Sequence, residues 1–557
     1  MKHQDSIKTS KTPISDLRNG DKKNLWINSF NPIKKRIRTF LLLFIFLSSS
    51  IIVFGHGVTV SGVRITGQNS VLDYKMVEFD LAWNNSWRIS SGVTTWDACW
   101  VFVKYRKKSE STWNHALLNY VDGSGSGDGH TEPAGSNISS SNDNGSGNSH
   151  GVFIYRSSDM AQGNVSYANV RLRWEYGDNG LADNDSVEVS VFAIEMVYVP
   201  KGSFYVGDGT STDIRGQFES GTSGAPLLIT SEGALTLGGG GAGSLGNNNA
   251  SGMNWADDFN DGTSKTLPAA FPKGYNDFYC MKYEITQQQY VEFLNRLTYT
   301  QQTARTEEAP NSAAGTGALE SSNINYSSID IMTPGVASTT PAVYACNLDG
   351  DANYNESNDG QNKACNFLSW YDVAAYLDWA ALRPMTELEY EKACRGDQFV
   401  IANEYAWGTT NITQATGISN AGAYNETVSN SGANVSYGNY SGVNGPLRSG
   451  CFGQGVNTRE GVGASFWGIM ELSGNLREMV ISVGSSTSRA FTGSHGDGEI
   501  SAAGDQNVSN WNGPTAMDYR GGDYYVTELQ HRVSDRYFLF YVGQDNKLGG
   551  RGVRSAP

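Results

Sequence analysis

The segment "NFLSWYDVAAYLDWAALRPMTELEYEKACRG", residues 366–396, decides the fold because it predicts two helices joined by a turn. One helix is expected over 369–380 and the next over 386–394, since each range begins with Ser or Thr followed three residues later by an acid, the pattern of a capping box. Pro384 prevents the two from forming one continuous helix. A third capped helix is predicted over "TQQQYVEFLNRL", 286–297.

Outside these helices, the composition of the chain predicts much irregular backbone. The chain has 557 residues, with 65 Gly, 13 Trp and 28 Tyr, and only 17% of its residues are charged. This length favours two or more domains. Abundant glycine and aromatic residues are typical of a loop-rich protein whose loops pack around large rings. Bound ions, buried aromatics or disulfides must hold such a backbone, because regular hydrogen-bond ladders are few.

Residues 56–194 predict a separate all-β, sandwich-like domain. Stretches such as "GVTVSGVRITGQNSV", "VEFDLAW" and "VEVSVFAIEMVYV" alternate apolar and polar positions and are rich in β-branched residues. Residues 195–557 form the second predicted domain, which carries Gly/Asn-rich insertions such as "LGGGGAGSLGNNNASG".

Residues 1–55 have the layout of a secretory signal, with a basic segment followed by the apolar run "FLLLFIFLSSSIIVFG". An uncleaved signal anchor is the alternative. Residues 1–55 carry ten Lys/Arg and three Asp/Glu, whereas the remainder carries 31 basic and 53 acidic residues, a net charge of −22. An acidic body argues against nucleic-acid partners and against membrane contact beyond the N-terminal signal or anchor. We therefore expect a secreted or cell-surface protein.

The six cysteines give no metal motif, because no two have CxxC spacing. Cys346 and Cys365 bracket an acidic loop and are the best candidates for a disulfide in an exported chain. The alternative is that the cysteines are buried free thiols.

Seven blocks of the second domain, in order, resemble the sulfatase-modifying-factor family, the family of the formylglycine-generating enzyme. The blocks are "MVYVPKGSFYVGDG" (196–209), "YCMKYEITQQQYVEFL" (279–294), residues 366–396, "YAWGTT" (405–410), "GIMELSGNLREM" (468–479), "YRGGDYYV" (519–526) with "RVSDR" (532–536), and "GGRGVR" (549–554). The resemblance implies an α+β, loop-rich variant of the C-type lectin fold, following the β domain.

The resemblance also implies structural calcium. In the family, the Gly-Asn turn within "GIMELSGNLREM" holds a calcium ion through side-chain and main-chain oxygens. Carried over by position, Glu471 and Glu478 supply side-chain oxygens, and Gly474 and Leu476 supply carbonyl oxygens. Asn420 is the match to a second family calcium site. The alternative is a turn without an ion, in which Glu478 pairs with an arginine.

The acidic loop "DGDANYNESNDG", residues 349–360, is a separate metal candidate. Its first ligand-spaced side chains match an EF-hand loop; these are Asp349, Asp351, Asn353 and Asn355. Tyr354 stands where the sharp-turn glycine belongs, and Gly360 stands where the bidentate Glu belongs. These departures favour a solvated loop.

The family's oxidase activity is not expected here. It depends on two cysteine thiolates, just after the Arg-Gly-Gly motif, that bind copper(I). The matching stretch, residues 520–536, contains no cysteine, and none follows Cys451. The two positions fall near Val526 and His531, so no copper is expected.

Two interpretations of function follow. The first is a pseudoenzyme, a calcium-stabilised binding or structural module whose partner is an unknown protein or glycan. The second is a copper- or iron-dependent oxidase with non-standard ligands drawn from Cys394, Cys451, His495 and His531.

Overall fold

A computed structural model describes residues 57–120, 129–209, 214–247, 254–320, 326–439, 441–453, 458–537 and 543–557. The predicted signal, residues 1–55, lies outside the described residues. Across the described ranges, none of the helices has both the length and the apolar character that crossing a membrane requires.

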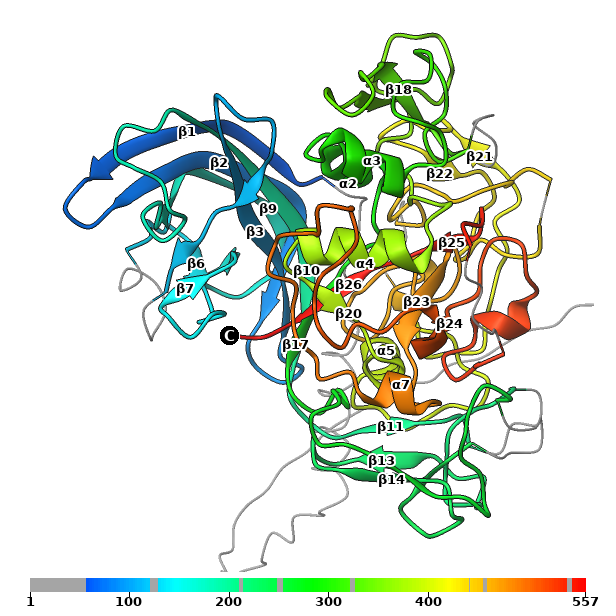
Figure 1. Ribbon diagram of the computed structural model, residues 1–557. Coiled ribbons are helices and arrows are strands. Elements are labelled where there is room, and N and C mark those ends of the chain that lie inside the picture. The colour runs from blue at the N-terminus through cyan, green and yellow to red at the C-terminus, as the bar shows by residue number, and fades with distance from the viewer. Residues whose placement is uncertain are drawn as a thin grey trace, which may run out of the picture. The chain divides into compact units, whose positions relative to one another are not determined.

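The described residues form an α+β, loop-rich fold, as predicted (Figure 1). The strands up to residue 199 are β1 (Thr59–Asn69), β2 (Tyr74–Ile89), β3 (Thr95–Lys107), β4 (Asn114–His115), β5 (Leu118–Asn119), β6 (Ser136–Ser139), β7 (Asn148–Ser149), β8 (Val152–Arg156), β9 (Met160–Trp174) and β10 (Val187–Val199). The later strands are β11 (Phe204–Val206), β12 (Glu219–Ser220), β13 (Leu227–Ile229), β14 (Leu235–Leu237), β15 (Leu245–Gly246), β16 (Lys265–Leu267), β17 (Phe278–Met281), β18 (Ile329–Thr333), β19 (Val343–Cys346), β20 (Arg383–Pro384), β21 (Ile418–Ser419), β22 (Thr427–Val428), β23 (Arg477–Ile481), β24 (Met517–Arg520), β25 (Leu548–Gly549) and β26 (Gly552–Ser555). The helices are α2 (Gln287–Leu294), α3 (Tyr299–Arg305), α4 (Trp370–Trp379), α5 (Glu387–Arg395), α6 (Arg459–Val462) and α7 (Ser486–Arg489), with short 3-10 turns η2 (Pro514–Ala516) and η3 (Glu528–His531).

The three helices predicted from capping boxes are present as α2, α4 and α5. Ser369 and Thr386 are the N-caps of α4 and α5, and in both helices the reciprocal hydrogen bonds of the capping box form. Helix α2 ends at Leu294, three residues before the predicted end. The short helices α3, α6 and α7 were not predicted, because segments of four to seven residues show too little periodicity.

One large sheet connects the N-terminal β region to the rest of the chain. Its strand order is β20-β26-β17-β10-β3-β2-β9-β5-β7. Strand β10 pairs with β3 on one side and with β17 on the other, and β17 pairs with the C-terminal strand β26. The predicted boundary at residue 194 therefore falls inside β10, and the two regions share this sheet (Figure 1).

Strand β3 is buried on both faces. Val101 and Val103 lie in the core between the β strands, whereas Trp100 and Phe102 point into the core that α2 and α4 cover. A strand buried on both sides reads as a continuous apolar run. This explains why "ACWVFV" lacks the apolar–polar alternation of the neighbouring strands.

The glycines of the last block allow the chain to pass close to α4. A Cβ atom at Gly550 would lie 2.8 Å from Val373, and one at Gly552 would lie 2.4 Å from Leu377. Both valine and leucine belong to α4 and are buried. Small residues are therefore required wherever β26 and the residues before it cross this helix.

The predicted disulfide between Cys346 and Cys365 is wrong, because all six cysteines are free thiols. Both side chains are buried in the same apolar core. Burial raises the pKa of each thiol well above its usual value. Cys346 and Cys365 therefore act as small apolar core residues.

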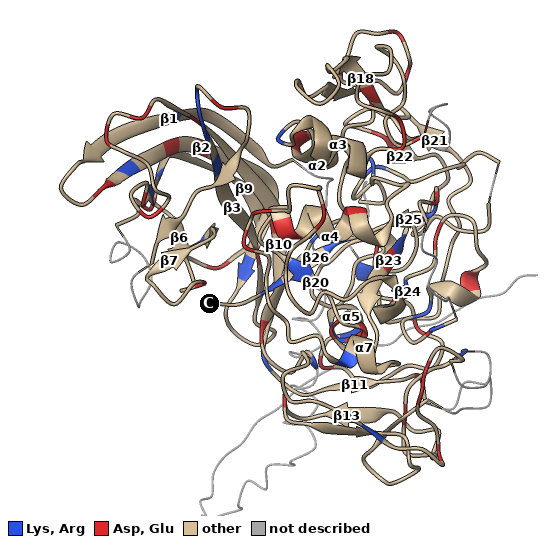
Figure 2. Cartoon of the chain, in the orientation of Figure 1, with Lys and Arg blue, Asp and Glu red and all other residues tan. Residues whose placement is uncertain are grey.

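In the second region, where regular hydrogen-bond ladders are few, buried ion pairs link the loops. Lys282 pairs with Glu195 at 2.6 Å, and Arg383 pairs with Glu389 at 2.6 Å; all four side chains are at most 3% exposed. Figure 2 shows residues of both signs on α5, in the middle of this region. Such pairs fix loops only if their hydrogen bonds are complete, since buried charges are costly when unpaired.

Candidate functional site

The Gly-Asn turn lies directly before β23 and requires glycine at residue 474. Gly474 has a φ of +106°, and its N–H donates to the Gly521 carbonyl at 2.7 Å. A Cβ atom here would lie 2.3 Å from Val435 Cγ2. Asn475 follows with a φ of +67°, and its Oδ1 accepts the Leu447 N–H at 2.7 Å. The turn is thus held against two other loops.

Two carboxylates flank this turn, and each has one unsatisfied oxygen. Glu471 accepts the Gly450 N–H on Oε1 at 2.7 Å, and Glu478 accepts Nε of Arg551 on Oε1 at 2.6 Å. The predicted alternative, an arginine partner for Glu478, is therefore present. Both Oε2 atoms are buried without a hydrogen-bond partner. A buried, unpaired carboxylate oxygen is costly and calls for a cation or a proton.

A third carboxylate, Glu284, contacts the same turn. It was not predicted from the sequence. Its two oxygens accept hydrogen bonds from the turn, one from the Leu476 N–H at 2.9 Å and one from the Asn475 side chain. Glu284 stands in the family block "YCMKYEITQQQYVEFL", where the only signal was its position just after a strand. Its role is to clamp the turn from the side of β17.

Burial and neighbouring acids raise the pKa of Glu471 and of Glu284. Burial raises the pKa of Glu471 to about 7, and the charge of Glu478 adds to this. Burial also raises the pKa of Glu284 well above its usual value, with contributions from Glu478 and Glu471. Arg551 opposes these effects but does not cancel them. The group therefore has an excess of negative charge that a bound cation would relieve.

These residues fit calcium by chemistry. Calcium prefers a mixed set of carboxylate and carbonyl oxygens on irregular backbone, and it inverts the electrostatics of nearby acids. The unsatisfied oxygens belong to Glu471 and Glu478, which come before and after the Gly474–Leu476 turn in the sequence.

Asn420, the expected second calcium ligand, lies on an exposed turn. It has a φ of +55°, and its carbonyl oxygen accepts the Ala423 N–H at 3.0 Å. Glu426, the next acid along the chain, is buried and pairs with Lys363 at 2.6 Å. The structure gives this position no unsatisfied acidic oxygen comparable to those of the Gly-Asn turn.

The segment after the Arg-Gly-Gly motif contains a buried histidine, His531. The Nδ1 and Nε2 atoms of His531 lie 3.0 Å from the Thr527 carbonyl and 3.1 Å from the Asp523 carbonyl. Burial lowers the pKa of His531 to about 4. Since both ring nitrogens face carbonyl oxygens, neither is open to a metal ion. Val526, at the other expected position, has no ligand atom in its side chain.

The alternative ligands are not gathered into a site. Within the described ranges, the one group of three or more His, Cys, Asp or Glu side chains with ligand atoms mutually within 4.8 Å is on the 349–360 loop. His495 Nε2 accepts the Ser555 N–H at 3.0 Å. Cys394 and Cys451 lie in different apolar clusters.

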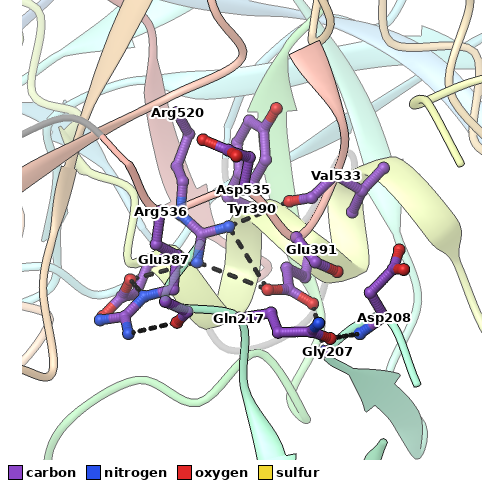
Figure 3. Close-up of polar contacts among 12 residues, drawn as sticks. Gly207, Asp208, Gln217, Glu387, Tyr390, Glu391, Arg520, Val533, Asp535 and Arg536 are labelled. Carbon is purple, nitrogen blue, oxygen red and sulfur yellow. Dashed lines mark hydrogen bonds and ion pairs between the residues drawn. The ribbon is translucent and has the colours of Figure 1, made fainter. Parts of the chain in front are cut away.

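Arginines and acids form a buried network around α5, and Figure 3 shows Glu387, Glu391, Arg520 and Arg536 from it. Arg520 pairs with Glu387 at 3.1 Å and with Glu391 at 3.3 Å, and Arg536 pairs with Glu387 at 2.7 Å and with Asp257 at 2.8 Å. All five side chains are fully buried or nearly so. The network joins α5, β24 and the segment after η3.

A family model described as "Sulfatase-modifying factor enzyme 1-like domain" matches residues 184–556. The chain belongs to this family. The matched range begins just before β10, so it includes the strand that the second region shares with the N-terminal β region. No curated protein matches the chain.

Two solved structures are similar to this sulfatase-modifying-factor family member. The structure of PvdO from Pseudomonas aeruginosa has 15% sequence identity and a TM-score of 0.31, and the match covers 65% of this chain and 95% of that one. Treponema denticola variable protein 1 has 11% identity and a TM-score of 0.28, with coverage of 66% and 96%. At these scores, neither likeness bears on function.

The family blocks account for the buried network. Glu387 and Glu391 come from the block 366–396, Arg520 from "YRGGDYYV", and Arg536 from "RVSDR". Arg551, the partner of Glu478, comes from "GGRGVR". Residues of the blocks that carry the family resemblance therefore form this network and the ion pair of Glu478.

Proposed function

We propose that this sulfatase-modifying-factor family protein is a calcium-stabilised binding or structural module without formylglycine-generating activity. The observation that carries the proposal is the environment of the segment after the Arg-Gly-Gly motif. It offers no thiol, and both nitrogens of His531 already face carbonyl oxygens. Copper(I) requires soft thiolate ligands, which this segment does not supply.

Calcium at the Gly-Asn turn is part of the same proposal. Glu471 and Glu478 would hold the ion with one oxygen each, and the carbonyl groups of Gly474 and Leu476 would add main-chain oxygens. The support is the pair of buried, unsatisfied Oε2 atoms together with the raised pKa of Glu471. Bound calcium would neutralise this group and fix the loops that meet there.

The protein is proposed to act at the cell surface or outside the cell, with a protein or glycan partner. The support for export is the layout of residues 1–55 and the acidic remainder of the chain. A cavity of about 490 Å³ offers a place for a polar ligand, since Trp113, Arg296, Tyr299 and Glu499 line it. Arg296 stacks on Trp113 at 4.8 Å, which holds both side chains in place.

The test uses purified full-length protein. We expect about one or more calcium ions per chain by elemental analysis, no stoichiometric copper or iron, and no conversion of a sulfatase peptide cysteine to formylglycine in the presence of copper and oxygen. Glycan-array binding that weakens in the Tyr299→Ala variant would support the cavity as the binding site. Aldehyde formation on the peptide, or stoichiometric copper or iron, would overturn the proposal and favour the oxidase.

A further inference from the structure

The cavity of about 490 Å³ is lined by segments of both the N-terminal β region and the family domain. Its walls come from residues 111–113 between β3 and β4, from residues 296–301 at the end of α2 and the start of α3, from the loops 338–341 and 498–502, and from Trp379 of α4. This volume lies in the range of pockets that bind small ligands. A ligand in the cavity would therefore contact both regions at once.

Arg296 brings a positive charge without a carboxylate partner to the cavity wall. One of its terminal nitrogens donates to the Ser190 hydroxyl at 3.1 Å, and the other donates to the Asn295 carbonyl at 3.4 Å. Both acceptors are neutral, and no acid of the described residues forms a salt bridge with Arg296. Burial lowers the pKa of Arg296; Glu292 opposes this shift, and the charge of Arg106 adds to it. An anion beside this guanidinium group would relieve the cost.

A comparison with Arg106 shows which of the two neighbouring arginines lacks a partner. The guanidinium carbons of Arg106 and Arg296 each lie 4.8 Å from the centroid of the Trp113 ring. Arg106 is neutralised by Glu188, whose carboxylate lies 2.7 Å from it. Arg296 instead has a second ring, that of Phe192, at 5.4 Å. The two rings hold Arg296 in place, so it is positioned for an anion before a ligand binds.

The remainder of the wall matches a sugar. It is rich in hydroxyl groups, most of them on exposed residues: Ser111, Thr112, Thr298, Tyr299, Thr300, Ser338 and Thr339. Trp379 adds a fixed apolar surface, since its ring packs edge-on against Phe102 and Phe192. A sugar ring has hydroxyl groups around its edge and C–H groups on its faces, and it can therefore use both kinds of wall.

The same wall is less suited to a peptide. None of the residues that line the cavity belongs to a strand. Pairing with a strand edge, by which many extended peptides bind, is therefore not offered here. The cavity favours a compact polar ligand.

Glu499 is the acid among the lining residues, and it is compatible with a sugar. Its Oε1 accepts the His115 N–H. Burial raises the pKa of Glu499, and the charge of Lys104 opposes this shift. Lys104 therefore offsets part of the negative charge at this wall. A carboxylate oxygen can accept a hydrogen bond from a sugar hydroxyl, whereas Arg296 would receive an acidic group of the same ligand.

We infer that this cavity binds a carboxylated sugar unit of a glycan, a uronate or a sialate, with Arg296 as the partner of the sugar carboxylate. The inference rests on the proposed function, and it narrows the protein or glycan partner given there to acidic glycans. The chain after residue 55 has a net charge of −22, which repels anions at long range. Selection of an acidic ligand therefore depends on Arg296 within the cavity.

The test is a glycan array on which each uronate- or sialate-bearing glycan stands beside its neutral counterpart, probed with purified full-length protein. We expect the acidic member of at least one pair to bind about tenfold or more tightly, because a hydrogen bond to a charged group is worth about that factor. Arg296→Gln should abolish this preference, and Arg296→Lys should retain part of it. Arg215→Gln is the matched control: it removes an exposed arginine that stacks on Tyr537 at 4.3 Å, outside the cavity, and should change nothing.

Thr300→Asp gives a second variant that does not disturb a buried contact. Thr300 is exposed in the first turn of α3, where an acid is favourable for the helix. The new carboxylate should repel acidic glycans and lower their binding about tenfold or more, while neutral counterparts keep theirs. This variant can be interpreted even if Arg296→Gln fails to fold.

Three results would overturn the inference. The first is equal binding, or no binding, of the acidic and neutral members of every pair. The second is an acidic preference that persists in both Arg296→Gln and Thr300→Asp. The third is a polyglutamate peptide on the same array that binds as tightly as any glycan and is lost in Arg296→Gln, since the partner would then be an acidic polypeptide. The proposed function is judged separately, by calcium content and by the formylglycine assay, so the two failures are distinguishable.

Discussion

Arg536→Met tests whether the buried network holds the fold together. The guanidinium group of Arg536 uses all five of its N–H donors, on Glu387, Asp257 and the Gly216 carbonyl, at distances from 2.7 to 3.1 Å. Methionine has a similar length but cannot donate. Glu387 would keep the Arg520 contact, whereas Asp257 would keep its contact with the Asn247 side chain.

The expected cost follows from the burial of the charges left behind. Removing one partner of a buried ion pair typically costs about 3–5 kcal/mol, because an uncompensated charge remains in the interior. Burial already raises the pKa of Asp257, and loss of Arg536 would raise it further. Asp257 would therefore take up a proton at a higher pH than in the wild type. The cost should be near the upper value at pH 8 and smaller at pH 5.

The assay is urea unfolding followed by tryptophan fluorescence, at pH 8 and at pH 5. Lys107→Met is the matched control, since it removes a 3.2 Å pair with Asp185 in which both side chains are about a third exposed. Such surface pairs contribute about 0–1 kcal/mol. The reasoning is refuted if Arg536→Met costs no more than Lys107→Met, or if its cost is the same at both pH values.

Three further predictions concern single residues. Burial raises the pKa of Asp208 from 3.8 to about 7, so the protein loses stability as the pH rises from about 4 to about 7, while the folded state keeps a proton that the unfolded state has released. Asp208→Asn should therefore gain stability relative to the wild type over that range, by up to about 1.4 kcal/mol per pH unit, in thermal melts. A constant difference across that range would contradict this. Gly474→Ala should lower the free energy of unfolding by about 1–3 kcal/mol, because its φ is positive and its Cβ would overlap Val435, and urea unfolding will measure this; a loss below 0.5 kcal/mol would contradict it. A chelator should lower the melting temperature of the wild type more than that of Glu471→Gln, since a ligand at 100 times its Kd stabilises by about 2.7 kcal/mol; equal shifts would argue against calcium at the turn.

Much of the fold was predictable because its signals are local. The helices α2, α4 and α5 each begin with a capping box, and four residues of sequence contain that information. The strands of the β region were predictable for the same reason, since alternation is visible within a single strand. The order of strands in the shared sheet was not predictable, because β10 pairs with strands that are far apart in the sequence.

The calcium ligands of the candidate site remain a prediction. The family resemblance pointed to Glu471 and Glu478, and both have an unsatisfied buried oxygen in the structure. Glu284 could not be found, because its contact with the Gly-Asn turn spans about 190 residues of sequence. The disulfide prediction failed for a related reason: the spacing of Cys346 and Cys365 says nothing about whether their side chains point towards each other in the core.

The buried network is formed by residues of the blocks that carry the family resemblance. Arg520, Arg536 and Glu387 satisfy one another, so substituting any one leaves a buried charge without a partner. These ion pairs contribute to the stability of the fold whatever reaction the protein performs. Residues 523–531, which follow the Arg-Gly-Gly motif, contain no cysteine and no residue of this network. Membership of this family therefore indicates how the chain folds, and a reaction must be argued from the residues of that one segment.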